Sequence, residues 1–278
     1  MKAIILASLS LLIFTSEIPN KKKCPSGEFV FIPAGSTIIA GQSLSLDAYW
    51  ISDREVSNCE YNAFLEALKE AGKDEEYAIC RIANDKWITE TSEFNEPYST
   101  YYSTHPAYEN YPVVNISHEA ALLYCEWLTE NSKEKNINYR LPSRIEWIYA
   151  ARGGLDIAEY AWGGPYLRNK KGEYMCNFRM IGDEFIHVND SNRITVAEEF
   201  IKTRDLTTIT APVDSYWPNE YGLYNACGNV AEMIDVRGVA MGGSWNDTGY
   251  DVRIESEKKY TDPSPFIGFR VLKEELPN

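Results

Sequence analysis

The chain has 278 residues, of which 44% are hydrophobic, so it can bury a full core and is not globally disordered. Its formal net charge is -14, from 41 acidic against 27 basic residues. This balance excludes a nucleic-acid-binding role, because such proteins need a basic surface. The surplus carboxylates serve either solubility or the binding of hard cations such as calcium.

The N-terminus has the pattern of a signal peptide. Residues 3–14 are almost wholly apolar and follow a single lysine, and the stretch is shorter than the roughly 20 apolar residues that span a bilayer. A buried N-terminal strand or helix is the alternative. We expect a signal peptide over 1–16, an N-terminal segment over 17–28, one domain over 29–278, and no transmembrane span after cleavage. The exported protein would lie in the periplasm or at the cell surface, in association with the outer membrane or free of it.

Residues 29–35 and 44–51 read as two strands, the first of which ends in a turn. A helix follows, because Tyr61, Phe64, Leu65 and Leu68 recur at the spacing of one helical face, and Ser57 or Asn58 can cap it. Residues 73–110 show no clean period, and we expect a long structured loop there.

Two more helices are expected further along. Ser117 is the N-cap of the first, whose buried stripe is Ala120, Leu123, Tyr124, Trp127 and Leu128. The second starts with a capping box of Ser143 and Glu146 and stops at Gly153-Gly154. Beyond it turns dominate, with candidate strands at 239–245 and 266–272.

Six cysteines occur, at positions 24, 59, 80, 125, 176 and 227. Export would permit disulfides, and six cysteines allow fifteen pairings, so the connectivity is open. The chain has no C-x-x-C motif, which disfavours a zinc site. Three lysines precede Cys24, a context that disfavours its lipidation.

A series of blocks runs along the chain in a fixed order. It comprises Phe31-Ile-Pro-Ala-Gly35, Glu55-Val-Ser-Asn58, Tyr111-Pro-Val-Val-Asn-Ile-Ser117, Tyr139-Arg-Leu-Pro-Ser143, Tyr221-Gly-Leu-Tyr-Asn225, Gly228-Asn-Val-Ala-Glu232, Gly242-Gly-Ser-Trp245 and Ile267-Gly-Phe-Arg270. This series resembles the formylglycine-generating enzyme family, which carries the sulfatase-modifying-factor domain, over roughly residues 29–272. The resemblance implies an α+β fold, a variant of the C-type-lectin fold with little regular secondary structure.

The resemblance also locates the family's copper site. Its catalytic branch oxidises a substrate cysteine with copper and O₂, and two thiolates hold the soft copper(I) ion. Asp247 and Val252 stand at those two positions. Aspartate is a hard ligand and valine is none, so we expect a vacated active site without copper and without catalytic residues. A second branch uses iron held by histidines, and the spacing of His105, His118 and His187 does not bring three together; His118 is expected to pack or to cap.

Two structural calcium sites are implied by the resemblance. The first maps onto Asn177, Phe178, Asp205 and Thr207, and the second onto Asn225, Gly228, Val230 and Glu232. Sets of carboxylate, amide and carbonyl oxygens are what Ca²⁺ favours. The alternative is that these asparagines only bridge turns.

These features favour a non-catalytic domain that binds other proteins of the bacterial cell envelope. Further blocks around residues 94–114 and 162–166 are similar to the gliding-motility and type IX protein secretion lipoproteins of Bacteroidetes, which lack the copper cysteines. Two alternatives stay open: an enzyme of altered chemistry, formylglycine-generating or otherwise oxidoreductive, and a lectin-like ligand binder. The candidate binding surface consists of Asn246, Asp247, Tyr250, Asp251 and Tyr260.

Overall fold

The computed structural model describes residues 24, 27–180, 186–188, 194–196 and 209–277. The expected signal peptide over 1–16 lies outside the described residues, and so do Asp205 and Thr207 of the first expected calcium site.

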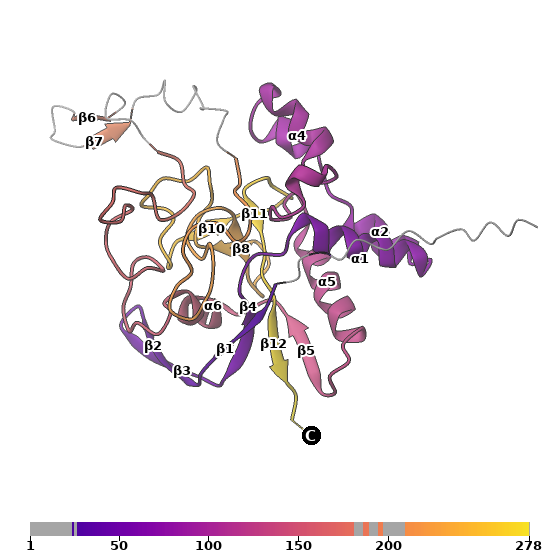
Figure 1. Cartoon of the computed structure of the whole chain (residues 1–278), viewed down its shortest axis with the longest axis horizontal. Helices are drawn as coiled ribbons and strands as arrows, with labels where there is room; N and C mark the ends of the chain where they lie inside the picture. Colours follow the sequence, from indigo (N-terminus) through magenta and orange to yellow (C-terminus); the bar gives the residue numbers. More distant parts are fainter. Residues whose placement is uncertain (1–23, 25–26, 181–185, 189–193, 197–208, 278) are drawn as a thin grey trace, which may run out of the picture.

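One antiparallel sheet has the strand order β1-β4-β12-β5. These strands are β1 (Phe29–Ile32), β4 (Tyr49–Ser52), β12 (Leu272–Glu275) and β5 (Ile137–Arg140). Figure 1 shows that β12, the last strand along the chain, lies beside β5 in this sheet. The sheet therefore joins the first and last segments of the domain.

A second sheet has the order β10-β9-β8-β11. Its strands are β10 (Glu257–Lys259), β9 (Val239–Met241), β8 (Ala231–Met233) and β11 (Ile267–Gly268). Only its β11 and β8 pair in parallel. Two separate hairpins pair β2 (Gly35–Ile39) with β3 (Gln42–Leu46) and β6 (Ile186–Val188) with β7 (Ile194–Val196).

The three expected helices are present with their expected caps. They are α1 (Asn58–Glu70), α5 (His118–Glu130) and α6 (Arg144–Ala151), capped by Ser57, Ser117 and Ser143. Figure 1 shows α1, α2 and α5 grouped on one side of the molecule. The His118 ring is buried and lies 2.8 Å from the carbonyl oxygen of Ile234, which confirms its packed role.

The expectation of a loop over 73–110 is wrong. This region forms the short helices α2 (Asp74–Cys80), α3 (Lys86–Thr89) and α4 (Glu96–Tyr101) and the 3-10 turns η1 (Glu93–Asn95) and η2 (Pro106–Tyr108). Helices of four to seven residues are too short to display a period, and tertiary packing stabilises them instead. Trp87 provides much of this packing, because its side chain is fully buried and contacts Tyr98 and Tyr102.

The expected strand over 44–51 is also divided. β3 ends at Leu46 and β4 begins at Tyr49, and β3 pairs with β2, a strand that the sequence pattern did not indicate. A two-residue turn with left-handed Ala40 and Gly41 connects this hairpin. The expected strands near 239–245 and 266–272 shorten to β9 and β11.

The main core is aromatic. Tyr61 and Phe64 of α1 meet Tyr124 of α5 and Phe269, with ring centroids 5.4–6.5 Å apart. A second cluster packs α6 against the irregular C-terminal half. In the described part of the chain, no helix combines the length and the apolar character required to cross a membrane.

One disulfide joins Cys24 to Cys59, at the start of α1. The remaining cysteines, Cys80, Cys125, Cys176 and Cys227, are free and buried.

Candidate functional site

A tight turn follows β9 and leads into the candidate site. Gly242 and Gly243 have φ angles of +82° and +67°. A Cβ atom on Gly243 would lie 2.4 Å from the carbonyl oxygen of Asp251. Only glycine fits there, because both the left-handed backbone and the close approach exclude a side chain.

Asp247 is held in place by hydrogen bonds on its carboxylate. Its Oδ2 atom accepts from the backbone nitrogen of Ser244 at 2.8 Å and from the Ser244 hydroxyl at 2.6 Å. The Lys258 ammonium lies 2.6 Å from Oδ1 and 2.7 Å from Oδ2. The carboxylate is therefore paired with a cation of its own chain.

Val252 is fully buried, in the same core cluster as Trp147 and Met241. Neither it nor Asp247 fits copper(I): one offers no donor atom, and the other offers a hard oxygen that is already paired with an ammonium group. Val252 packs in the core, and Asp247 forms an ion pair with Lys258.

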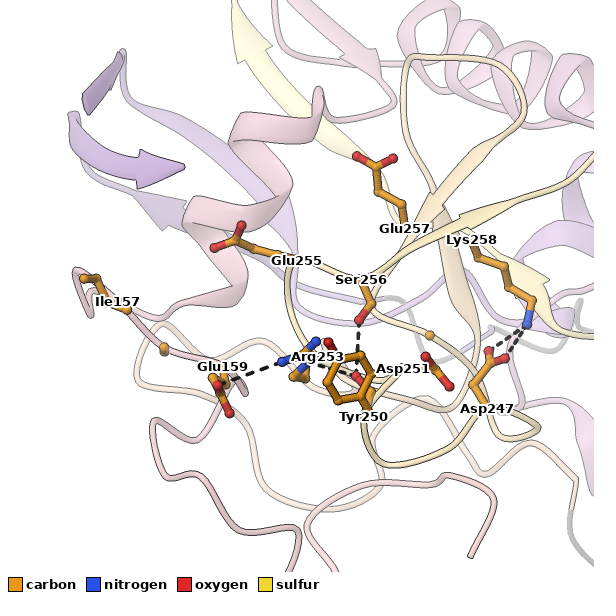
Figure 2. A pocket seen from close by; sticks show the side chains of 12 residues that line it. Ile157, Glu159, Asp247, Tyr250, Asp251, Arg253, Glu255, Ser256, Glu257 and Lys258 are labelled. Atoms are coloured by element: carbon orange, nitrogen blue, oxygen red, sulfur yellow. Dashed lines mark hydrogen bonds and ion pairs between the residues drawn. The ribbon is translucent and has the colours of Figure 1, made fainter. Parts of the chain in front are cut away.

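A cleft of about 680 Å³ lies next to the ion pair of Asp247 and Lys258, and both residues line it. Five carboxylates and two basic groups line it (Figure 2); they are Glu159, Asp247, Asp251, Glu255 and Glu257, with Arg253 and Lys258. Arg152 and Arg144, from outside the lining, pair with Glu255 and Glu257. The Glu159 and Asp251 carboxylates are the ones that favour a cationic ligand group.

Tyr250 is the exposed ring of the cleft, and 69% of its surface is accessible. The Arg253 guanidinium stacks over the ring at 3.5 Å from its centroid, and its Nε donates to the Tyr250 carbonyl. Arg253 also approaches Glu159 at 3.9 Å. In Figure 2 the guanidinium lies between Glu159 and the Tyr250 ring, so the aromatic group is oriented before any ligand arrives.

The expected binding surface is only partly assembled. Asp247, Tyr250 and Asp251 line the cleft, whereas half-buried Asn246 lies outside its lining. Tyr260 contradicts the expectation. Its ring packs against the main core, and its hydroxyl is buried without a hydrogen-bond partner among the described residues.

A buried charge cluster connects the two sheets behind the site. The Arg270 guanidinium donates to both carboxylate oxygens of Glu232 at 2.5 Å, and Trp147 Nε1 donates to Oε2 at 2.7 Å. Both partners are almost wholly inaccessible to solvent. This pairing differs from the expected role of Glu232 as a calcium ligand, because a guanidinium occupies both of its oxygens.

Glu55 is the second carboxylate of the cluster. It accepts from the side-chain amides of Asn229 at 2.8 Å and Asn225 at 3.1 Å. Burial and the nearby Glu232 carboxylate raise the pKa of Glu55 to about 8. Two acids thus share one arginine, and the excess negative charge calls for a proton or a bound cation.

Asn225 provides the observation that fits calcium. Its backbone has a φ of +50°, and its Oδ1 atom is buried without a hydrogen-bond partner in the described part of the chain. Such an orphaned amide oxygen is a suitable Ca²⁺ ligand. The amide thus fits the second expected site, while Glu232 would have to share its carboxylate with Arg270.

The first expected calcium site is described only in part. Asn177 and Phe178 are buried, and the Asn177 amide donates to the Ile209 carbonyl and to Asn229 Oδ1. Within the described ranges, no three His, Cys, Asp or Glu side chains cluster as a metal site.

Lys258, Glu55 and Arg270 are functional candidates that the sequence did not indicate. Glu55 and Arg270 both stand in blocks that carry the family resemblance, at Glu55-Val-Ser-Asn58 and Ile267-Gly-Phe-Arg270, and that position was the available signal. Lys258 has no local signal, because its partner depends on the pairing of β10 with β9.

The FGE-sulfatase family, described as the sulfatase-modifying factor enzyme 1-like domain, matches residues 15–275. A formylglycine-generating enzyme of Thermomonospora curvata is 38% identical over 123 residues, which are 44% of this chain and 32% of that protein. An "Inactive C-alpha-formylglycine-generating enzyme 2" of Bos taurus is 32% identical over 148 residues, or 50% of this chain and 40% of that protein.

The matched region therefore spans less than half the length of these two curated relatives. Among solved structures, CarF superposes with a TM-score of 0.59 and 19% identity, over 91% of this chain and 99% of that chain. At that identity the likeness supports the fold alone.

Proposed function

Since the chain belongs to the sulfatase-modifying factor enzyme 1-like domain family, we propose that it acts as a non-catalytic binding domain of this family. Its place would be the bacterial cell envelope, as a component of an exported assembly.

The ion pair between Asp247 and Lys258 carries the non-catalytic part of this proposal. An oxidation that requires two copper-bound thiolates has no sulfur at either position. A relative of the same family is named inactive, so loss of the activity has a precedent among similar chains.

The cleft supports the binding part. It offers carboxylates and one exposed aromatic ring on a short rigid segment, and aromatic residues dominate many binding hot spots. A segment that carries lysine or arginine fits it best, because those groups pair with carboxylates and can stack on Tyr250.

Calcium is part of the same proposal, as a structural ion. Asn225, Gly228, Val230 and Glu232 would hold one ion, and Asn177, Phe178, Asp205 and Thr207 the other. The unpaired Asn225 Oδ1 and the excess buried negative charge support the first of these assignments. A bound Ca²⁺ would lower the cost of keeping Glu55 and Glu232 ionised together.

The envelope location and a role in type IX secretion or gliding rest on the resemblance of residues 94–114 and 162–166 to that branch, and on the expected signal peptide. The partner would be an exported or outer-membrane protein with a basic segment.

The catalytic question is tested by incubating the purified protein with copper and a cysteine-containing peptide. We expect no aldehyde product and no O₂ uptake, whereas a relative with both cysteines serves as the positive control. Turnover by this chain would overthrow the non-catalytic proposal.

The binding question is tested by capturing partners from native envelope extracts. The variant Glu159→Gln with Asp251→Asn should lose capture, and Glu66→Gln on α1 is the matched control. Equal capture by both variants would show that the cleft does not bind the partner.

A further inference from the structure

Two of the four free cysteines lie in one part of the interior. Cys176 and Cys227 are both buried and belong to the same core cluster, together with Trp147 and Val252. Cys80 and Cys125 belong to the other, aromatic cluster. The backbone nitrogen of Ala161 lies 3.4 Å from the Cys227 sulfur, which fixes the position of that thiol.

The backbone segments that carry Cys176 and Cys227 are in direct contact. The next residue after each cysteine provides the evidence, because a Cβ on Gly228 would lie 2.3 Å from the carbonyl oxygen of Asn177. The backbone nitrogen of Asn229 also donates to this oxygen at 2.8 Å. Cys176 directly precedes Asn177, and Cys227 directly precedes Gly228. Because consecutive Cα atoms are about 3.8 Å apart, the Cα atom of each cysteine lies about 3.8 Å from that of a residue in this contact.

We propose that Cys176 and Cys227 are a dithiol that closes to a second intramolecular disulfide in an oxidising compartment. One cysteine thiolate attacks a disulfide of a small-molecule or protein oxidant and releases its first thiol. The other cysteine then attacks the mixed disulfide and releases the second thiol. The chain loses two protons and two electrons, and the oxidant gains them.

Both thiols are buried in the folded structure, so this exchange takes place before burial is complete, while an oxidant can still reach them. The bond therefore forms during folding. Once formed, it ties residues 176–178, which include two ligands of the first proposed calcium site, to residues 225–230, which include three ligands of the second. It thus links the two proposed calcium sites covalently, and it does not depend on the proposed binding function.

Refolding of the full chain tests this proposal. The reduced, unfolded protein is refolded in mixed oxidised and reduced glutathione, alkylated with iodoacetamide, and mapped by mass spectrometry after tryptic digestion without reduction. We expect the peptide 172–179 to be joined to the peptide 205–237, at a mass lower by two hydrogens than their sum. Cys80 and Cys125 should be alkylated, and the Cys24–Cys59 link reports that oxidation has occurred.

A variant series distinguishes the proposed Cys176–Cys227 disulfide from the Cys24–Cys59 disulfide. In a Cys24→Ser, Cys59→Ser background, reduction should still lower the melting temperature, and additional Cys176→Ala should remove that dependence. Cys125→Ala is the matched control and should leave the dependence intact. Alkylation of both Cys176 and Cys227 in refolded chains that contain the Cys24–Cys59 link would overturn the proposal, as would a link from either residue to Cys80 or Cys125.

Discussion

The Lys258 ammonium lies 2.6 Å and 2.7 Å from the two carboxylate oxygens of Asp247, eleven residues earlier in the chain. The pair joins the glycine turn after β9 to the neighbouring strand β10. The resemblance implies a copper ligand at position 247, and in this chain the residue there forms an ion pair with a strand residue.

Removal of this contact should destabilise the domain modestly. Lys258→Met leaves the partly buried Asp247 carboxylate without its cation, and hydrogen bonds to charged groups contribute about 1.5–3 kcal/mol. We expect a loss of about 1–2 kcal/mol in the free energy of unfolding, measured by urea denaturation. Lys259→Met is the matched control, because Lys259 is exposed and pairs at the surface. Equal effects of the two substitutions would contradict a special role for Lys258.

The buried pair of Arg270 and Glu232 should contribute far more. Arg270→Met leaves a carboxylate uncompensated in the core, and breaking a buried pair typically costs about 3–5 kcal/mol. We expect a loss of that order in guanidinium denaturation. The double variant Arg270→Met, Glu232→Gln should recover part of it, and a double variant no more stable than the single one would refute this explanation.

Calcium removal should lower the melting temperature. A ligand that binds only the native state stabilises it by mass action, and Asn225→Ala or Glu232→Gln should remove most of the difference between curves with and without calcium. Asn246→Ala should retain it. The comparison uses the calcium-dependent difference, because Asn225→Ala also removes hydrogen bonds to Glu55 and Val213. Identical melting curves after chelation would eliminate both proposed sites.

Acid should weaken the domain through Glu274. A hydrogen bond from Arg140 holds the pKa of Glu274 below its usual value of 4.5. The folded state therefore binds this proton less tightly than the unfolded chain. The contribution is fully present above 4.5 and is lost as the pH falls through the folded pKa.

The variant Glu274→Gln should accordingly be less stable than the wild type near neutral pH. This difference should shrink toward zero in strong acid, as measured by denaturation across the pH range. A difference that is independent of pH would mean that the loss is due to packing and not to charge.

The glycine turn should not tolerate alanine. Gly243→Ala combines a left-handed backbone with a contact of 2.4 Å, and we expect a loss of about 3 kcal/mol from the two effects together. Gly172→Ala is the matched control, because the φ of Gly172 is +83° but no neighbouring atom would lie within 4 Å of an added Cβ. This variant should therefore lose only about 1 kcal/mol of the free energy of unfolding. Thermal denaturation of both variants decides whether the close approach matters.

The sequence predicted those parts of the fold that depend on local chemistry. The caps Ser57, Ser117 and Ser143 are satisfied within a few residues, so their helices were found. The helices of residues 73–110 were missed, because burial of Trp87 and Tyr102 by distant residues stabilises them. The β2–β3 hairpin was missed because its turn has no Asn-Gly or Asp-Gly signal.

The positions of the candidate site residues could be predicted from the sequence, but the residues that they contact could not. Resemblance located Asp247 and Val252, whereas the pairing of Asp247 with Lys258 depends on strand register. Tyr260, one residue past the end of β10, is half-buried because its ring packs against the main core. Glu232 was expected to be a calcium ligand. Its contact with Arg270 arises only when β8 and the segment after β11 come together.

The position of β12 has a consequence for synthesis on the ribosome. Its partners β4 and β5 emerge more than a hundred residues earlier, yet they acquire their shared neighbour only when residues 272–275 arrive. Until then both strands present unpaired edges, which are prone to association with other chains. A nascent chain of this protein should therefore need a holding chaperone until its final strand is released, and its folding should be slow, because the closing contacts are distant in sequence.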